Sequence, residues 1–291
     1  MESQSNIAPL IVILGETGSG KSDLAMALAK QFNGEIISAD SRAVYKGMDV
    51  GTAKPSLEDR KRIKHYLIDV VTPDQRFTVV DFKGRAQAAI DEITSAGKVV
   101  FLVGGTGLYI DALLYDFSFR PAGNQKLREE LSALSAEELL NRLVAQGLPV
   151  PEQWQNKRHL IRVLESGGVQ PTKAALRPST LLIGLRPERN NLRATITARV
   201  DIMVQNGFID ELKRLVWHYG WGLPALQTPG YKAFRSYING DGSLDEAKQA
   251  FIRNDMRLAR RQRTWFKRNE AIQWENDRSK IVGLVTTFLN K

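Results

Sequence analysis

The segment from Pro9 to Lys30, PLIVILGETGSGKSDLAMALAK, restricts the possible folds more than any other part of the sequence. An apolar run enters a glycine-rich turn, and Lys21, Ser22 and a helical pattern follow. Residues 15–22, GETGSGKS, fit the pattern G-x-x-x-x-G-K-[ST]. A strand before such a loop and a helix after it predict a phosphate-binding loop in an α/β protein.

Each part of this loop has an expected role. Backbone N–H groups of the glycine-rich turn curl around phosphate oxygens, and the following helix N-terminus adds its dipole. Lys21 supplies a positive charge, and the Ser22 hydroxyl can ligate Mg²⁺, the one cofactor that we expect. Glu16 is unusual, since a carboxylate opposes anion binding unless it points away. The predicted phosphate-binding residues are Gly15, Glu16, Thr17, Gly18, Ser19, Gly20, Lys21 and Ser22.

The composition narrows the class of protein. A chain of 291 residues with 43% hydrophobic residues can bury a substantial core. The absence of cysteine excludes disulfides and thiolate catalysis. The net charge of +9 indicates a polyanionic partner. The N-terminus lacks signal-peptide features, and the apolar runs are too short to span a bilayer, so we expect a cytoplasmic, monomeric protein away from membranes.

Short apolar runs that end in Gly or Asp recur along the chain and read as buried parallel strands: LIVILG, EIISAD, KVVFLVGG and TLLIGL. Helical patterns separate them. We therefore predict an α/β fold with a P-loop NTPase-like parallel sheet flanked by helices. From about 119 to 178 polar helical patterns replace the strands, which predicts a helical insert. The predicted domains are 1–118, 119–178 and 179–291, the last with basic C-terminal helices.

Asp40 is the acidic residue most closely associated with the loop. An NTPase or small kinase usually carries an Asp at the end of another apolar strand to hold Mg²⁺, but VVFLVGG ends in glycine. Asp40 instead ends EIISAD, the run that follows the first helix. It is either a functional carboxylate or a turn residue, and the spacing alone leaves both open.

Longer segments carry a specific resemblance. GEIISADSRAVYKGMDVGTAKPS, HYLIDVVTPDQRFTVVDF and VGGTGLYIDALL together resemble tRNA dimethylallyltransferases, also called tRNA isopentenyltransferases. The C-terminal segments GYKAFRSYINGD and RLARRQRTWFKRN resemble the same family. The resemblance implies that the loop holds the diphosphate of dimethylallyl diphosphate. It also implies that the dimethylallyl group moves to N6 of the adenosine immediately 3′ of the tRNA anticodon.

The resemblance assigns the catalytic roles to Asp40, Thr106 and Arg199. Asp40 would hydrogen-bond the adenine N6 and accept its proton, and Thr106 and Arg199 would contact the diphosphate. Taken by themselves, Thr106 reads as a turn residue between glycines and Arg199 as a solvated helix arginine. The family often has a second arginine one helical turn before Arg199, and this chain has Thr195 there.

A basic helix supplies the predicted surface for tRNA. Residues 251–270 contain seven Lys or Arg and two Asp or Glu, with four arginines on one helical face and Trp265 and Phe266 beyond. We expect at least one of these two aromatic side chains to pack in the core, and the arginine face to lie apart from the diphosphate site. The predicted tRNA-contacting residues are Asp40, Ser41, Arg42, Ala43, Thr106, Arg128, Arg158, Arg162, Arg257, Arg260 and Arg261.

Other functions remain open at this level. A phosphate-binding loop also suits a small-molecule kinase, or an isopentenyltransferase that acts on free adenylate. A P-loop RNA-binding module without activity is the non-enzymatic alternative, and Glu16 and Thr195 are its best support. The segment ESGG, residues 165–168, is shorter than the family's usual segment, so the insert has fewer residues with which to hold RNA.

Overall fold

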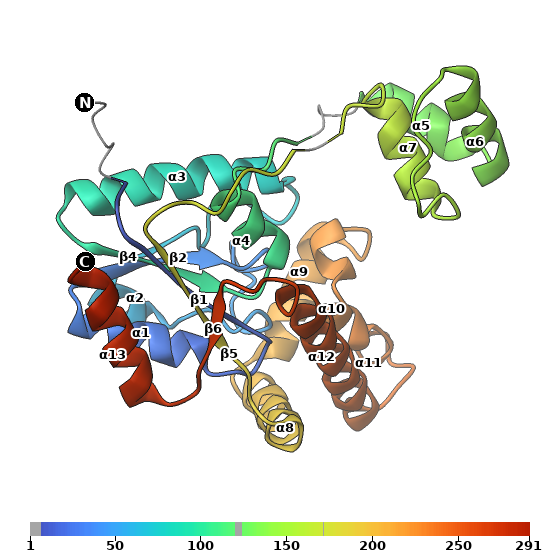
Figure 1. The fold of residues 1–291 in the computed structure, drawn as a ribbon. Helices are drawn as coiled ribbons and strands as arrows, with labels where there is room; N and C mark the ends of the chain where they lie inside the picture. The colour runs from blue at the N-terminus through green and yellow to red at the C-terminus, as the bar shows by residue number, and fades with distance from the viewer. Residues whose placement is uncertain (1–6, 120–123, 171) are drawn as a thin grey trace, which may run out of the picture. The chain divides into compact units, whose positions relative to one another are not determined.

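The computed structural model describes residues 7–119, 124–170 and 172–291. A parallel sheet with the strand order β3-β2-β4-β1-β5-β6 lies at its centre (Figure 1). The predicted parallel α/β sheet is therefore confirmed, although the two-residue edge strand β3 was not predicted. The strands are β1 (Leu10–Gly15), β2 (Gly34–Ala39), β3 (His65–Tyr66), β4 (Val99–Gly104), β5 (Thr180–Leu185) and β6 (Ile272–Trp274).

Helices connect these strands and build the C-terminal region. The segment from residue 189 to 219 forms two helices, because Gly207 adopts a left-handed φ of +92° between them. The helices are α1 (Lys21–Gln31), α2 (Leu57–Arg62), α3 (Val79–Ser95), α4 (Gly107–Leu114), α5 (Gln125–Ala133), α6 (Ala136–Ala145), α7 (Lys157–Glu165), α8 (Arg189–Gln205), α9 (Phe208–Tyr219), the 3₁₀ helix η1 (Pro224–Gln227), α10 (Pro229–Ala233), α11 (Arg235–Asn239), α12 (Leu244–Phe266) and α13 (Arg278–Leu289).

Helices cover both faces of the sheet. On one face Ile11 and Ile13 of β1 pack in a cluster with Leu24 and Leu28 of α1, and α13 extends the same cluster. On the other face lie α3 and α4, where the rings of Phe82 and Tyr109 stack with centroids 4.3 Å apart (Figure 1). All six residues of β1 are buried, as expected for a central strand with both faces covered.

The carboxyl ends of the central strands meet at one edge of the sheet. Leu14 of β1 pairs with Gly104 of β4, and Ala39 of β2 pairs with the same glycine. A Cβ atom on Gly104 would lie 2.2 Å from the carbonyl oxygen of Ala39, so only glycine allows this approach. The loops that follow β1, β2 and β4 are consequently neighbours, and they carry Lys21, Asp40 and Thr106.

A buried carboxylate ties the C-terminal helices to the loop after β2. Glu211 of α9 is 3% exposed. It accepts hydrogen bonds from the backbone N–H groups of Asp49, Val50 and Gly51 at 2.7–3.0 Å, and from the hydroxyl of Tyr231 at 2.7 Å. Four donors compensate the cost of burying this charge.

The chain divides into two compact units. The first unit consists of two stretches of the chain, one up to Leu114 and one from Leu176 onward. The second unit is the stretch between them, Tyr115–Ala175. The predicted insert had limits of 119 and 178; its residues 120–123 and 171 lie outside the described residues. Within the second unit, α5, α6 and α7 pack around a leucine-rich cluster that includes Leu131, Leu139 and Leu160. None of the described helices combines the length and apolar character that crossing a bilayer requires.

Candidate active site

The loop between β1 and α1 has the geometry that its glycines predict. Gly18 and Gly20 adopt left-handed φ values of +76° and +80°, which side chains disfavour. A Cβ atom on Gly18 would lie 3.2 Å from side-chain atoms of both Leu192 and Ile196. Helix α8, which carries Arg199, therefore packs directly against the tip of the loop.

Lys21 lies at the electrostatic centre of the site. Its ammonium donates a hydrogen bond to the backbone oxygen of Glu16 at 3.2 Å. Burial lowers the pKa of Lys21 to about 8, and the negative charges of Asp40, Glu16 and Asp255 oppose this effect, whereas Arg199 adds to it. These four charged residues therefore lie close enough to Lys21 to influence its charge, although they come from four different segments.

Asp40 is both a turn residue and an available carboxylate. Its Oδ1 accepts hydrogen bonds from the backbone N–H groups of Arg42 at 2.7 Å and Ala43 at 3.4 Å. Among the described residues, no group donates to Oδ2. The turn thus fixes the orientation of the carboxylate with one oxygen and leaves the other for a ligand.

Thr106 connects the ends of two strands. Its Oγ1 accepts a hydrogen bond from the backbone N–H of Ser41 at 3.1 Å, and its own N–H donates to the oxygen of Ala39 at 3.2 Å. Its carbonyl oxygen accepts hydrogen bonds from the backbone N–H groups of Tyr109 at 2.9 Å and Ile110 at 3.2 Å, in the first turn of α4. Thr106 therefore builds the turn and places its hydroxyl beside the Asp40 loop, whereas its contact with the diphosphate stays a prediction.

Arg199 is held by an acidic partner that sequence reasoning missed. Its Nη2 donates to Oδ2 of Asp255 on α12, and its Nε is buried without a hydrogen-bond partner among the described residues. Burial raises the pKa of Asp255, and Arg199 opposes that shift. A solvated arginine is thus the wrong description of Arg199, since a buried N–H without an acceptor is available for a bound anion.

Helix α12 contacts the phosphate loop directly. Gln262 accepts a hydrogen bond from the backbone N–H of Thr17 at 2.8 Å and donates to the oxygen of Gly105 at 2.9 Å. Arg263 forms an ion pair with Glu16, whose side chain is 3% exposed. The C-terminal part of α12 therefore belongs to the surroundings of the loop, and the separation of the arginine face from the diphosphate site stays a prediction. The sequence feature that could have predicted a partner such as Arg263 is Glu16, because a carboxylate inside an anion-binding loop requires a neighbouring cation.

The predicted tRNA-contacting residues fall into different environments. In the first unit Arg42, Arg257, Arg260 and Arg261 are exposed, whereas Ala43 is 5% exposed and serves the Asp40 turn. Beyond Arg261, Phe266 is buried. This confirms that one of the two aromatic side chains packs in the core.

The other predicted tRNA-contacting arginines lie in the second unit: Arg128, Arg158 and Arg162. Arg128 donates to both oxygens of Glu165 at 2.6 and 2.7 Å, and Arg162 donates to the same carboxylate at 3.1 Å. Burial would raise the pKa of Glu165, but the two arginines lower it. Arg158 is exposed at the start of α7. Two of the three arginines thus stabilise the unit itself.

A cavity of about 270 Å³ joins the loop to Asp40. Lys21, Ser22 and Asp40 contribute polar groups to its lining. Its apolar lining comes from Ala25, Met26, Ile36, Ala43, Ile68 and Val103. Lys21, Ser22 and Asp40 therefore line one space, whose further polar lining comes from Asp23, Ser38, Thr52, Lys54, Ser56, Asp59 and His65.

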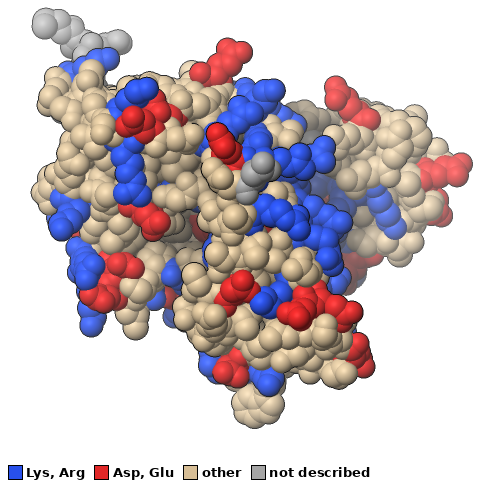
Figure 2. All heavy atoms as spheres, turned by 90° about the horizontal axis from the view of Figure 1, so that it is seen from below, with Lys and Arg blue, Asp and Glu red and all other residues tan. Residues whose placement is uncertain are grey.

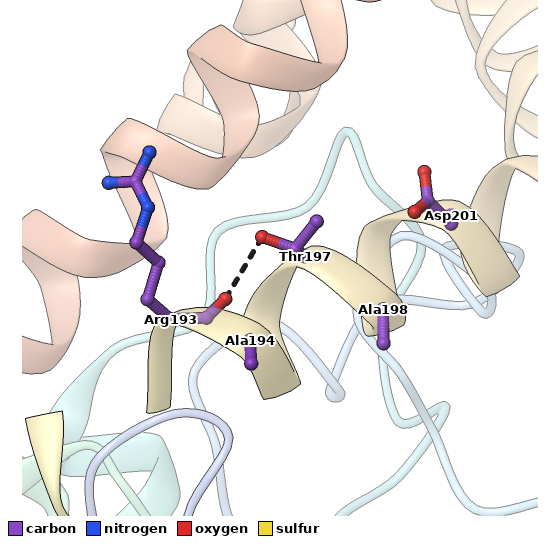
Figure 3. A pocket seen from close by; sticks show the side chains of 5 residues that line it. All are labelled: Arg193, Ala194, Thr197, Ala198 and Asp201. Carbon is purple, nitrogen blue, oxygen red and sulfur yellow. Dashed lines mark hydrogen bonds between the residues drawn. The ribbon is translucent and has the colours of Figure 1, made fainter. Parts of the chain in front are cut away.

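A second hollow runs along the outer side of α8. Its lining consists of Arg193, Ala194, Thr197, Ala198 and Asp201, and Thr197 donates a hydrogen bond to the backbone oxygen of Arg193 at 2.9 Å (Figure 3). The described lining includes neither loop residues nor Asp40 or Thr106. This hollow is thus separate from the candidate site. Among the described residues, no cluster of three or more His, Asp or Glu side chains could hold a metal ion.

Comparisons with known proteins place this arrangement in a family. The family model described as IPP transferase matches residues 43–269. The chain is 43% identical to tRNA dimethylallyltransferase 2 of Geotalea uraniireducens, with 91% of each chain covered. It is 39% identical to tRNA dimethylallyltransferase of Staphylococcus haemolyticus, with 97% of this chain and 92% of the relative covered.

Solved structures agree with the sequence comparison. The full-length tRNA isopentenylpyrophosphate transferase of Bacillus halodurans has a TM-score of 0.73 at 35% identity, with 97% of this chain and 95% of that chain covered. A eukaryotic dimethylallyltransferase acting on tRNA has a TM-score of 0.75 at 26% identity, and the match covers 89% of this chain and 70% of that chain. The residues that the family model matches include Thr106 and Arg199. The chain is therefore an enzyme of the IPP transferase family.

Proposed function

We propose that the enzyme transfers the dimethylallyl group of dimethylallyl diphosphate to N6 of the adenosine immediately 3′ of the tRNA anticodon. The observation that carries this proposal is the shared cavity, in which Lys21 of the phosphate loop and the carboxylate of Asp40 line one space. A leaving-group site and a base site thus adjoin each other, which a direct transfer between two substrates requires.

The donor side stabilises a departing diphosphate. The donors that support this role are the backbone N–H groups of the loop, the Lys21 ammonium and the Nε–H of Arg199, which has no acceptor in the described part of the chain. Charge develops on the diphosphate as the C–O bond breaks, so fixed positive groups there lower the barrier. Thr106, whose Oγ1 already accepts from Ser41, keeps its hydroxyl proton for a phosphate oxygen.

Mg²⁺ fits this side as a cofactor. Ser22 is exposed at the start of α1 and lines the same cavity, so its hydroxyl would be the protein ligand of an ion held mainly by phosphate oxygens and water. The ion would supply additional positive charge to the leaving group. Lys21 and the loop amides orient the diphosphate in either case.

The acceptor side activates the adenine amine. The lone pair of an exocyclic amine is delocalised into the ring, so the amine is a poor nucleophile. Asp40 Oδ2 is open among the described residues and accepts a hydrogen bond from N6, while Oδ1 keeps the carboxylate oriented. The N–C bond forms as the C–O bond breaks, Asp40 takes the N6 proton, and diphosphate leaves.

Shape and charge support tRNA as the acceptor. The apolar wall of the cavity, which includes Met26, Ile36 and Val103, accommodates the dimethylallyl chain. Exposed arginines of α12 (Arg257, Arg260 and Arg261) can contact RNA phosphates, and Lys and Arg side chains gather in a band on the face shown in Figure 2. The target adenine must leave its stack to reach Asp40. We expect the enzyme to act as a cytoplasmic monomer.

Mass spectrometry of nucleosides from tRNA incubated with the enzyme, dimethylallyl diphosphate and Mg²⁺ tests the proposal. N6-(dimethylallyl)adenosine should appear next to the anticodon, and inorganic diphosphate should be released in equal amount. Free adenylate in place of tRNA is the control for the related acceptor. Unmodified tRNA together with phosphoryl transfer from ATP would refute the proposal and favour a kinase.

A further inference from the structure

An ion pair lies inside the phosphate loop, where a carboxylate is least expected. Glu16 accepts two hydrogen bonds from Arg263 of α12, from Nη2 to Oε1 at 2.5 Å and from Nε to Oε2 at 3.2 Å. Nη2 of Arg263 also contacts the backbone oxygen of Pro187 at 3.4 Å. The guanidinium therefore joins the loop, α12 and the segment that follows β5.

The charge of Glu16 acts on the phosphate-binding lysine. Lys21 donates a hydrogen bond to the backbone oxygen of Glu16, and the Glu16 carboxylate is among the charges that raise the pKa of Lys21 against burial. Without a cation of its own, a carboxylate buried to this degree would repel a bound diphosphate and compete with it for Lys21. Arg263 satisfies both oxygens of this carboxylate.

Arg263 and Gln262 hold the loop at two successive positions. Gln262 fixes the backbone N–H of Thr17, and Arg263 fixes the side chain of the residue before it, Glu16. The Nε and Nη2 groups of Arg263 donate to Glu16 and Pro187, so these donors are directed at the loop carboxylate and its neighbouring segment.

We propose that Arg263 is a positioning residue of the diphosphate loop, which neutralises and orients Glu16 so that a loop carrying a carboxylate still binds an anion. This inference rests on the proposed function, because it presupposes that the loop binds the diphosphate of the donor. It predicts that the need for Arg263 disappears when the charge of Glu16 is removed.

A double-mutant cycle tests this prediction with four proteins: the wild type, Arg263→Met, Glu16→Gln and the Glu16→Gln/Arg263→Met double variant. The readouts are dimethylallyl diphosphate binding with Mg²⁺ by calorimetry, the donor KM, tRNA affinity and thermal unfolding. Arg263→Met should weaken donor binding by about tenfold or more, because it leaves an uncompensated carboxylate near the anion. The double variant should recover to within about threefold of the wild type. The donor KM should follow these changes, whereas tRNA affinity should stay near that of the wild type.

Arg253→Met is the matched control, since Arg253 is exposed on the same helix and should leave donor affinity unchanged. Wild-type affinity in Arg263→Met, or a double variant as weak as Arg263→Met, would overturn the inference, the latter because Arg263 would then bind the donor itself. If Arg263→Met does not fold, the double variant decides: affinity near that of the wild type supports the inference, and a loss of more than about tenfold overturns it. Failure of the wild type to bind the donor would instead refute the proposed function, and the inference with it.

Discussion

Gln262 accepts a hydrogen bond from the backbone N–H of Thr17 at 2.8 Å, although 245 positions separate the two residues in the sequence. The same side-chain amide donates to the oxygen of Gly105 at 2.9 Å. One side chain therefore links the loop after β1 to the loop after β4. This relationship makes α12 part of the candidate site as well as the predicted surface for tRNA.

Replacement of Gln262 should weaken this link. Gln262→Ala leaves the Thr17 N–H and the Gly105 oxygen without their partner, so the free energy of unfolding should fall by about 1–3 kcal/mol. Donor affinity should fall as well, because the loop loses a fixed point. Gln262→Glu keeps an acceptor for Thr17 but opposes two oxygens at Gly105, so it should not restore stability. Denaturant unfolding of both variants measures the effect, and unchanged stability of Gln262→Ala would contradict it.

Asp40→Asn tests the proposed base. An amide side chain keeps an oxygen for the turn to Arg42 and Ala43 but cannot accept the N6 proton. Binding of donor and tRNA should stay near wild type, and single-turnover prenylation should fall by about two orders of magnitude or more. Rapid-quench measurements with saturating substrates give this rate. A decrease of only a few-fold would reduce Asp40 to a turn residue.

The exposed arginines of α12 should govern the salt dependence of tRNA binding. Replacing Arg257 and Arg260 by alanine should weaken tRNA binding and reduce the log–log salt slope by up to about two units. Donor affinity should not change, because the loop contacts come from Gln262 and Arg263 on this helix. Binding titrations over a salt series provide the slope, and a melting curve excludes damage to the fold. Equal slopes would mean that these arginines do not contact RNA phosphates.

The depressed pKa of Lys21 predicts a pH limit for donor binding. Burial lowers this pKa from 10.5 to about 8. Below pH 8 the lysine is charged in both the folded and the unfolded state, and its burial costs folding free energy. Between pH 8 and 10.5 the folded state has lost the proton and the unfolded state has not. The free energy of unfolding therefore rises with pH over that range. Affinity for the diphosphate should instead fall above pH 8, since the neutral amine no longer attracts it.

Lys21→Arg is the control for this pH effect, because arginine keeps its charge throughout the range. Calorimetric titrations from pH 6.5 to about 9.5 should show that the decrease in affinity is smaller in the arginine variant. Parallel pH profiles of both proteins would show that a group other than Lys21 causes the decrease in affinity.

Glu211 should be important for stability. Glu211→Ala removes the acceptor of three backbone N–H groups at residues 49–51, and the free energy of unfolding should fall by roughly 3 kcal/mol or more. Tyr231→Phe removes one donor only and should cost about 1 kcal/mol. Thermal and denaturant unfolding compare the two variants. Similar losses for both would show that the backbone hydrogen bonds do not depend on this carboxylate.

Most of the fold was predictable because its signals are local. The apolar runs of β1, β2, β4 and β5 and the glycines of the phosphate loop act within a few residues of sequence, where strand and turn preferences operate. The strand β3 was missed, since a strand of two residues is too short to give a periodic pattern.

The sequence by itself determined the phosphate loop, the parallel sheet and the place of Asp40 at the end of β2, because chain order and strand polarity bring these features to one edge. Only the tertiary structure decided which charges meet. It paired Arg263 with Glu16, Arg199 with Asp255, and both Arg128 and Arg162 with Glu165. Such pairs depend on side chains from distant segments that become neighbours through packing, and no periodicity in the sequence records that proximity.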